Sequence, residues 1–140
     1  MNDLWFRLLL GHCVGDYLLQ NDWMSLNKKK RWLPLFVHCT LYTIAVCAFL
    51  WDDLMTYGVL TKAIIVIFGS HIIFDGTKII DKWLAFIGSR SWDKVAIHDR
   101  DTWHWQGQMY GMYTAIVQTV ADNTAHLVLM YWGLKSLLRF

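Results

Sequence analysis

Glutamate is missing from this sequence, because all eleven acidic residues are aspartate. The absence excludes the Glu-x-x-His pairs with which ferritin-like helical bundles bind two iron ions. Charge of either sign is also scarce, at 17% of the residues, whereas a typical soluble domain carries about 25%. The net charge of +2, without a basic stripe that includes aromatic residues, argues against nucleic-acid binding.

Cysteine is rare, and its three positions do not form a Cys-x-x-Cys pair. Cys13, Cys39 and Cys47 each lie in an apolar run, which argues against a disulfide framework or a thiolate zinc site and predicts small buried hydrophobic residues. The first residues lack the charged start and the small-residue cleavage site of a signal peptide. We therefore expect the first apolar segment to remain in the mature protein.

Hydrophobic residues are abundant, at 56% of the chain, and nine of them are tryptophan. They gather in four apolar segments, 3–20, 34–51, 57–80 and 107–133. A membrane-spanning helix needs about 20 apolar residues. The sequence therefore predicts a single domain, 1–140, with an all-α fold: an integral membrane bundle of about four transmembrane helices.

Two polar segments, 21–33 and 81–106, separate these helices and contain eight of the thirteen Lys and Arg residues. We interpret 81–106, with its four tryptophans, as an interfacial loop or a short amphipathic helix on the membrane surface. Because basic loops stay in the cytoplasm, both segments are predicted to be cytoplasmic and both termini to lie outside. The run 28–31 is interpreted as a topology signal.

Histidine and aspartate recur four residues apart within the apolar segments. The pairs are His12 with Asp16, His71 with Asp75 and, in reverse order, Asp122 with His126. Residues four apart project from one face of a helix. His38 lies alone in the second segment. Ionisable groups in a bilayer are costly unless they are paired or bind a cation.

Imidazole and carboxylate together suit zinc, iron or manganese. The sequence therefore predicts a divalent-metal site of one or two ions, with zinc favoured. Gln20 and Asn123 are predicted to orient ligands. The predicted ligands are His12, Asp16, His38, His71, Asp75, Asp122 and His126.

Other interpretations of these residues stay open. Each His–Asp pair is also explained by a hydrogen bond that fixes helix register. Asp122 and His126 would lie at the same depth in the membrane as the other pairs only if the fourth helix begins near Met112. His98 and His104, in the polar segment, are interpreted as exposed and are left out of the site. Gly69 is predicted to allow close helix approach.

The block Gly11-His-Cys-Val-Gly-Asp-Tyr-Leu-Leu-Gln20 precedes a lysine-rich loop and His38. Together with His71-Ile-Ile-Phe-Asp75 and Asp122-Asn-Thr-Ala-His126, it resembles the bacterial and phage membrane proteins of domain of unknown function 3307. That family often has Asp-Gln before the last histidine, where this chain has Asp122-Asn123. The resemblance implies a multi-pass protein of the bacterial inner membrane and no settled activity. A looser similarity, in architecture and His/Asp content, is to small inner-membrane metal-dependent hydrolases.

These observations predict a metal-dependent hydrolase that acts on a phosphoester of a lipid or lipid-linked substrate at the bilayer. Asp122 is predicted to act as general base and Lys78 to neutralise the phosphate. The alternatives are a non-catalytic ion or proton transporter, a structural or regulatory membrane protein using the same pairs, and oxidative di-iron chemistry. A homo-oligomer is compatible with each of them.

Overall fold

Every element in the described part of the chain is a helix. The computed structural model describes residues 4–88 and 104–138, with the side chains of 104–107 left out. The all-α prediction is therefore confirmed. His98 and most of the predicted interfacial segment 81–106 lie outside the described residues, as does the side chain of His104.

The four apolar segments correspond to helices, with shifted ends. Segment 3–20 forms α1 (Leu4–Cys13) and a π-helix, η1 (Val14–Leu18). Segment 34–51 forms α3 (Trp32–Phe49), and segment 107–133 lies within α8 (His104–Leu138). Segment 57–80 forms α5 (Leu60–Gly76), which ends earlier than predicted because Thr77 has an extended backbone, with φ −124° and ψ 170°.

Three shorter helices occupy the connections. The predicted loop 21–33 contains α2 (Asp22–Asn27), which Asn21 caps by accepting a hydrogen bond from the Met24 N–H. A second short helix, α4 (Trp51–Thr56), follows α3, and Gly58 turns the chain towards α5 with φ 61°. The third, α6 (Ile79–Phe86), overlaps the beginning of the predicted interfacial segment 81–106.

One helix among the described residues, α3, is long and apolar enough to cross a membrane, with a mean hydropathy of 1.7. The pair α5 and α6 meets the same criterion when the two are taken together as one interrupted span. This finding is consistent with membrane association and does not by itself establish the four predicted spans.

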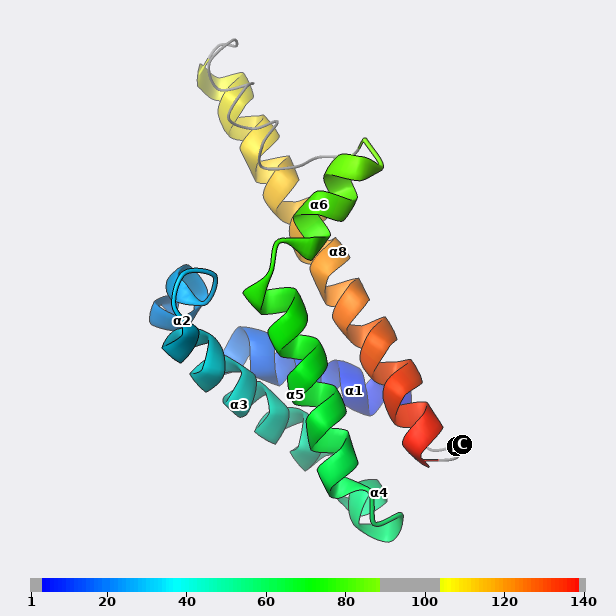
Figure 1. Ribbon diagram of the computed structural model, residues 1–140. Coiled ribbons are helices and arrows are strands. Elements are labelled where there is room, and N and C mark those ends of the chain that lie inside the picture. Colours follow the sequence, from blue (N-terminus) through cyan, green and yellow to red (C-terminus); the bar gives the residue numbers. More distant parts are fainter. Residues whose placement is uncertain (1–3, 89–103, 139–140) are drawn as a thin grey trace. The chain divides into compact units, whose positions relative to one another are not determined.

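The chain forms two compact units: residues 1–77 with 126–140, and residues 78–125. In the first unit, α3 contacts α1, η1, α2 and α5, and Figure 1 shows it running alongside α5. In the second unit, the Gln118 amide donates a hydrogen bond of 2.7 Å to Asp81 Oδ1. Helix α8 contributes residues to both units.

Glycines allow α1 and η1 to approach α3 closely. A Cβ added to Gly11 would lie 2.9 Å from the Val46 Cα, and one added to Gly15 would lie 2.5 Å from Tyr42 Cδ2. Small residues four apart let two helix backbones pack at short range. The prediction for Gly69 is wrong, because a Cβ there meets nothing within 4 Å.

Apolar side chains from α1, α3, α4, α5 and the end of α8 form the core of the first unit, including Leu8, Val46, Leu54, Ile67 and Met130. At one side of this core, Arg7 Nη1 donates to Asp53 Oδ2 at 2.6 Å, and Arg7 Nε donates to the Phe49 carbonyl, also at 2.6 Å. Through these two hydrogen bonds, Arg7 joins α1 to α3 and α4. The predicted ligands other than Asp122 lie in the same unit.

Candidate metal centre

The histidines of the apolar segments lie together inside the first unit. His12, His38, His71 and His126 expose 1% or less of their surface, and Asp75 exposes 2%. They come from α1, α3, α5 and α8. Buried polar groups are costly unless they are satisfied, so their convergence requires a compensating partner.

Four side-chain atoms meet at the centre of this cluster: His38 Nε2, His71 Nε2, Asp16 Oδ1 and Asp75 Oδ2, here called the ligand quartet. The two Nε2 atoms are 2.9 Å apart. Asp75 Oδ2 lies 2.8 Å from His38 Nε2 and 3.2 Å from His71 Nε2. Asp16 Oδ1 lies 3.4 Å from both nitrogens. Ligands at about 2.0–2.1 Å around a tetrahedral zinc ion lie ~3.3 Å apart, so these separations are close to those of a coordinated ion.

Three atoms of the cluster are buried without a hydrogen-bond partner: Asp16 Oδ1, His38 Nδ1 and His71 Nδ1. A neutral imidazole carries its proton on one ring nitrogen only. Two unprotonated Nε2 atoms at 2.9 Å repel each other unless a proton or a cation lies between them. A cation at the ligand quartet would remove this repulsion and would also satisfy the Asp16 oxygen.

Two groups of three residues have ligand atoms within 4.8 Å of one another: Asp16, His38 and His71, and His71, Asp75 and His126. Both groups use His71. Either group could hold a single ion, and two ions would have to share His71 as a ligand. His12 is in neither group, and its role as a ligand stays a prediction.

The π-helix positions Asp16 at the edge of the cluster. Its wider turn is closed by a hydrogen bond of 3.0 Å from the Leu19 N–H to the Val14 carbonyl. Asp16 directs Oδ2 towards His12 Nδ1 at 3.5 Å and Oδ1 towards the other two histidines. Single π-turns inside helices occur frequently at functional sites.

Lys28, at the end of α2, supplies a cation that the sequence interpretation missed. Its Nζ donates to Asp75 Oδ2 at 2.7 Å and to Gln20 Oε1 at 2.8 Å, and lies 3.5 Å from His38 Nε2. Gln20 thus contacts Lys28, and its predicted role in orienting a ligand remains untested. Lys28 and Asp75 are 47 residues apart, so no local spacing signals the contact.

Tyr42 is the second residue that the sequence interpretation missed, and it is fully buried. Its ring stacks on that of His71, with centroids 3.6 Å apart and planes at 13°. Its hydroxyl lies 2.8 Å from His12 Nδ1 and donates to Met130 Sδ at 3.3 Å. Tyr42 follows His38 by four residues, the spacing that singled out the His–Asp pairs, so a wider search of that face could have found it.

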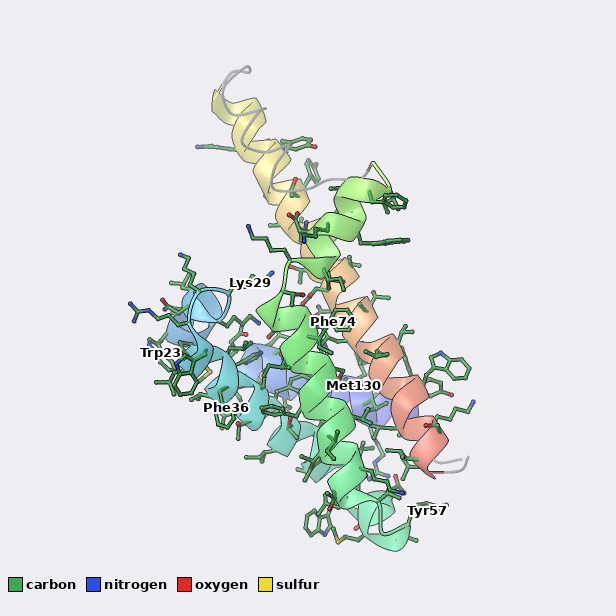
Figure 2. The ribbon with its side chains drawn as sticks, in the orientation of Figure 1. Trp23, Lys29, Phe36, Tyr57, Phe74 and Met130 are labelled. Atoms are coloured by element: carbon green, nitrogen blue, oxygen red, sulfur yellow. The ribbon has the colours of Figure 1, made fainter. Side chains whose placement is uncertain are left out.

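Three predicted residues, Lys78, Asp122 and Asn123, fall in the second unit. Their predicted roles, catalytic for Lys78 and Asp122 and orienting for Asn123, stay predictions. His126, the partner of Asp122 in the sequence, belongs to the first unit, where Phe74 packs edge-on against its ring at 4.9 Å between centroids; Figure 2 labels Phe74 on α5.

The sequence model of the family described as "Protein of unknown function (DUF3307)" matches residues 4–131. The chain belongs to this family. No curated protein and no solved structure matches it. In this DUF3307 protein, the matched region contains every residue of the ligand quartet, as well as Lys28, Tyr42 and His126.

Proposed function

We propose that this DUF3307 protein is an integral membrane protein with a divalent-metal centre that hydrolyses a phosphoester of a lipid or lipid-linked substrate. The ligand quartet carries the proposal, because two nitrogens and two carboxylate oxygens converge in a buried site at separations of 2.8–3.4 Å. Two imidazoles with two carboxylates suit zinc, and iron or manganese as well.

Hydrolysis is supported by two side chains of the cluster that are partly exposed to solvent. The side chains of Asp16 and Lys28 are 12% and 15% exposed, whereas those of His38, His71 and Asp75 are 3% exposed or less. Water and substrate would therefore reach the ion past Asp16 and Lys28. A bound divalent ion supplies a hydroxide nucleophile near neutral pH and polarises a phosphoryl oxygen.

Membrane integration is supported by apolar side chains on the outside of the helices. Phe6 on α1, Ile44 on α3 and Ile65 on α5 are 52%, 59% and 66% exposed. Soluble monomers rarely expose large contiguous apolar surfaces. We propose four spans in a bacterial inner membrane, with residues 21–33 in the cytoplasm, which would put Lys28 at the level of lipid headgroups.

A proton or ion relay is the second candidate function, because the same groups form a continuous chain of polar contacts. Lys28 contacts Asp75, Asp75 contacts His71, and Asp16 links His71 to His12 through its two oxygens. Chains of carboxylate and histidine groups inside membranes conduct protons in pumps and transporters. This reading requires no metal.

Metal content of the purified protein tests the two readings. We expect one or two equivalents of zinc, iron or manganese by plasma mass spectrometry, and a loss of metal in His71→Ala and Asp75→Asn. Asp52→Asn is the matched control, because Asp52 is exposed on α4. Absence of metal from chelator-free wild-type protein would reject the hydrolase, and proton flux in liposomes would then test the relay.

A further inference from the structure

Lys28 is the cation nearest to the ligand quartet among the described residues, and the proposed chemistry does not yet use it. Its Nζ lies 2.7 Å from Asp75 Oδ2 and 3.5 Å from His38 Nε2. An ion coordinated by these ligands would lie close to Nζ. A group bound to the ion would therefore be within reach of the ammonium.

The charges of the cluster favour an anion at this place. Asp16 and Asp75 contribute two negative charges, and Lys28 contributes one positive charge. Binding of one divalent ion changes the summed charge of the site from −1 to +1. A net positive charge in a buried site is compensated by an anionic oxygen, which both the ion and a charge-assisted hydrogen bond from Lys28 can bind.

Lys28 is followed by three basic residues, all of them exposed: Lys29, Lys30 and Arg31. Figure 2 labels Lys29 at the end of α2. Basic clusters attract anionic substrates and the anionic headgroups of lipids. Lys28 is thus the first of four consecutive basic residues, and the other three face solvent.

We propose that Lys28 binds a phosphoryl oxygen of the substrate beside the metal ion, so that the substrate is an anionic phosphate ester and not a neutral ester or amide. The inference rests on the proposed metal centre. It assigns to Lys28 a binding role that the sequence prediction gave to Lys78.

Binding of inorganic phosphate to the metal-loaded full chain, in phosphatidylcholine nanodiscs, tests this role by calorimetry. Lys28→Met keeps the length of the side chain and removes its charge, and we expect phosphate affinity to fall at least about tenfold while metal content is unchanged. Lys62→Met, the matched control at an exposed lysine of α5, should stay within about twofold.

Gln20→Leu provides a second test if Lys28→Met does not fold. It removes the acceptor that orients Nζ and leaves the charge in place, so we expect a loss of phosphate affinity of about threefold. Phosphatidic acid in the nanodiscs separates the two sources of phosphate: weaker phosphate binding indicates a lipid headgroup at Lys28, and unchanged binding indicates a soluble phosphate ester.

The outcomes separate failure of this inference from failure of the metal centre. A metal-free wild-type protein overturns both. A metal-loaded Lys28→Met protein that binds phosphate as tightly as the wild type overturns the role of Lys28 and leaves the centre standing. If Lys28→Met does not fold, unchanged phosphate affinity in Gln20→Leu overturns the role of Lys28.

Discussion

The ring of Tyr42 lies flat against the ring of His71, with centroids 3.6 Å apart and planes at 13°. The same tyrosine carries its hydroxyl to His12 Nδ1 at 2.8 Å. Tyr42 thus fixes the plane of one quartet histidine and holds a second, neighbouring histidine. Ring orientation decides whether a histidine lone pair points at an ion.

Tyr42→Phe should separate these two contacts. The substitution keeps the stacked ring and removes the hydroxyl, so His12 Nδ1 loses its contact of 2.8 Å with Tyr42. We expect the free energy of unfolding in detergent to fall by about 1–2 kcal/mol and metal content to stay unchanged. Loss of metal in Tyr42→Phe would show that the hydroxyl, and not the stacked ring, orders the centre.

Gly15→Ala tests the close approach of η1 to α3. The added Cβ would lie 2.5 Å from Tyr42 Cδ2 and 3.2 Å from its Cα, and overpacking of this kind costs about 1–3 kcal/mol. Because Tyr42 must move, we also expect reduced metal content. Gly69→Ala is the matched control: its Cβ meets nothing within 4 Å, and alanine favours a helix by up to about 1 kcal/mol. Equal stabilities for the two variants would contradict the packing.

Asp53→Asn tests the ion pair between α1 and α4 apart from the metal centre. Asp53 is 11% exposed and accepts a hydrogen bond of 2.6 Å from Arg7. Because Arg7 is 28% exposed, solvent screens part of the interaction, and we expect a loss of about 1–2 kcal/mol.

The neighbouring Asp52→Asn should change the unfolding free energy by no more than about 0.5 kcal/mol, since Asp52 is exposed. Metal content should be that of the wild type in both variants. A metal-deficient Asp53→Asn protein would mean that α4 supports the centre, contrary to this expectation.

His38→Ala and His126→Ala distinguish one ion from two. His38 belongs to one group of potential ligands and His126 to the other. A single ion at the ligand quartet predicts that His38→Ala loses metal and that His126→Ala keeps the wild-type amount. Two ions predict that His126→Ala keeps one of them. Complete loss in His126→Ala with full retention in His38→Ala would move the ion to the group of His71, Asp75 and His126.

Added zinc should stabilise the chelator-treated protein by mass action. At a free zinc concentration about 100 times the dissociation constant, the free energy of unfolding rises by about 2.7 kcal/mol. We expect a higher melting temperature in the wild type and no shift in His71→Ala, measured in the same detergent. An equal shift in both proteins would place the bound zinc elsewhere.

Local spacing predicted which of the candidate residues share a helix face, and not the individual contacts between helices. His71 with Asp75 and His12 with Asp16 could be identified because residues four apart share a helix face. The contact between His38 and Asp75 depends on the packing of α3 against α5, which no local pattern contains. Lys28 was missed for the same reason.

The helices differ in the same way in how far the sequence predicts them. Long apolar runs predicted α3 and α5 because the signal accumulates over many residues. The short helices α2 and α4 have six residues each, which is too few for a periodic signal. Asn21 caps α2, and α4 contacts Arg7 through Asp53. The sequence pattern groups Asp122 and His126 as one pair, although only His126 lies in the unit that contains the cluster.

The contacts that join the cluster connect parts of the chain that are synthesised at different times. They link residues 30, 33, 47 and 88 positions apart, whereas helical hydrogen bonds are local. We therefore expect the helices to form first and the cluster to be completed when the end of α8 packs against α3 and α5. Until then its aspartates and histidines lack their partners, and a premature chain end before His126 would leave the interior polar and open. Completion of this buried site consequently reports that the two chain segments of the first unit have come together.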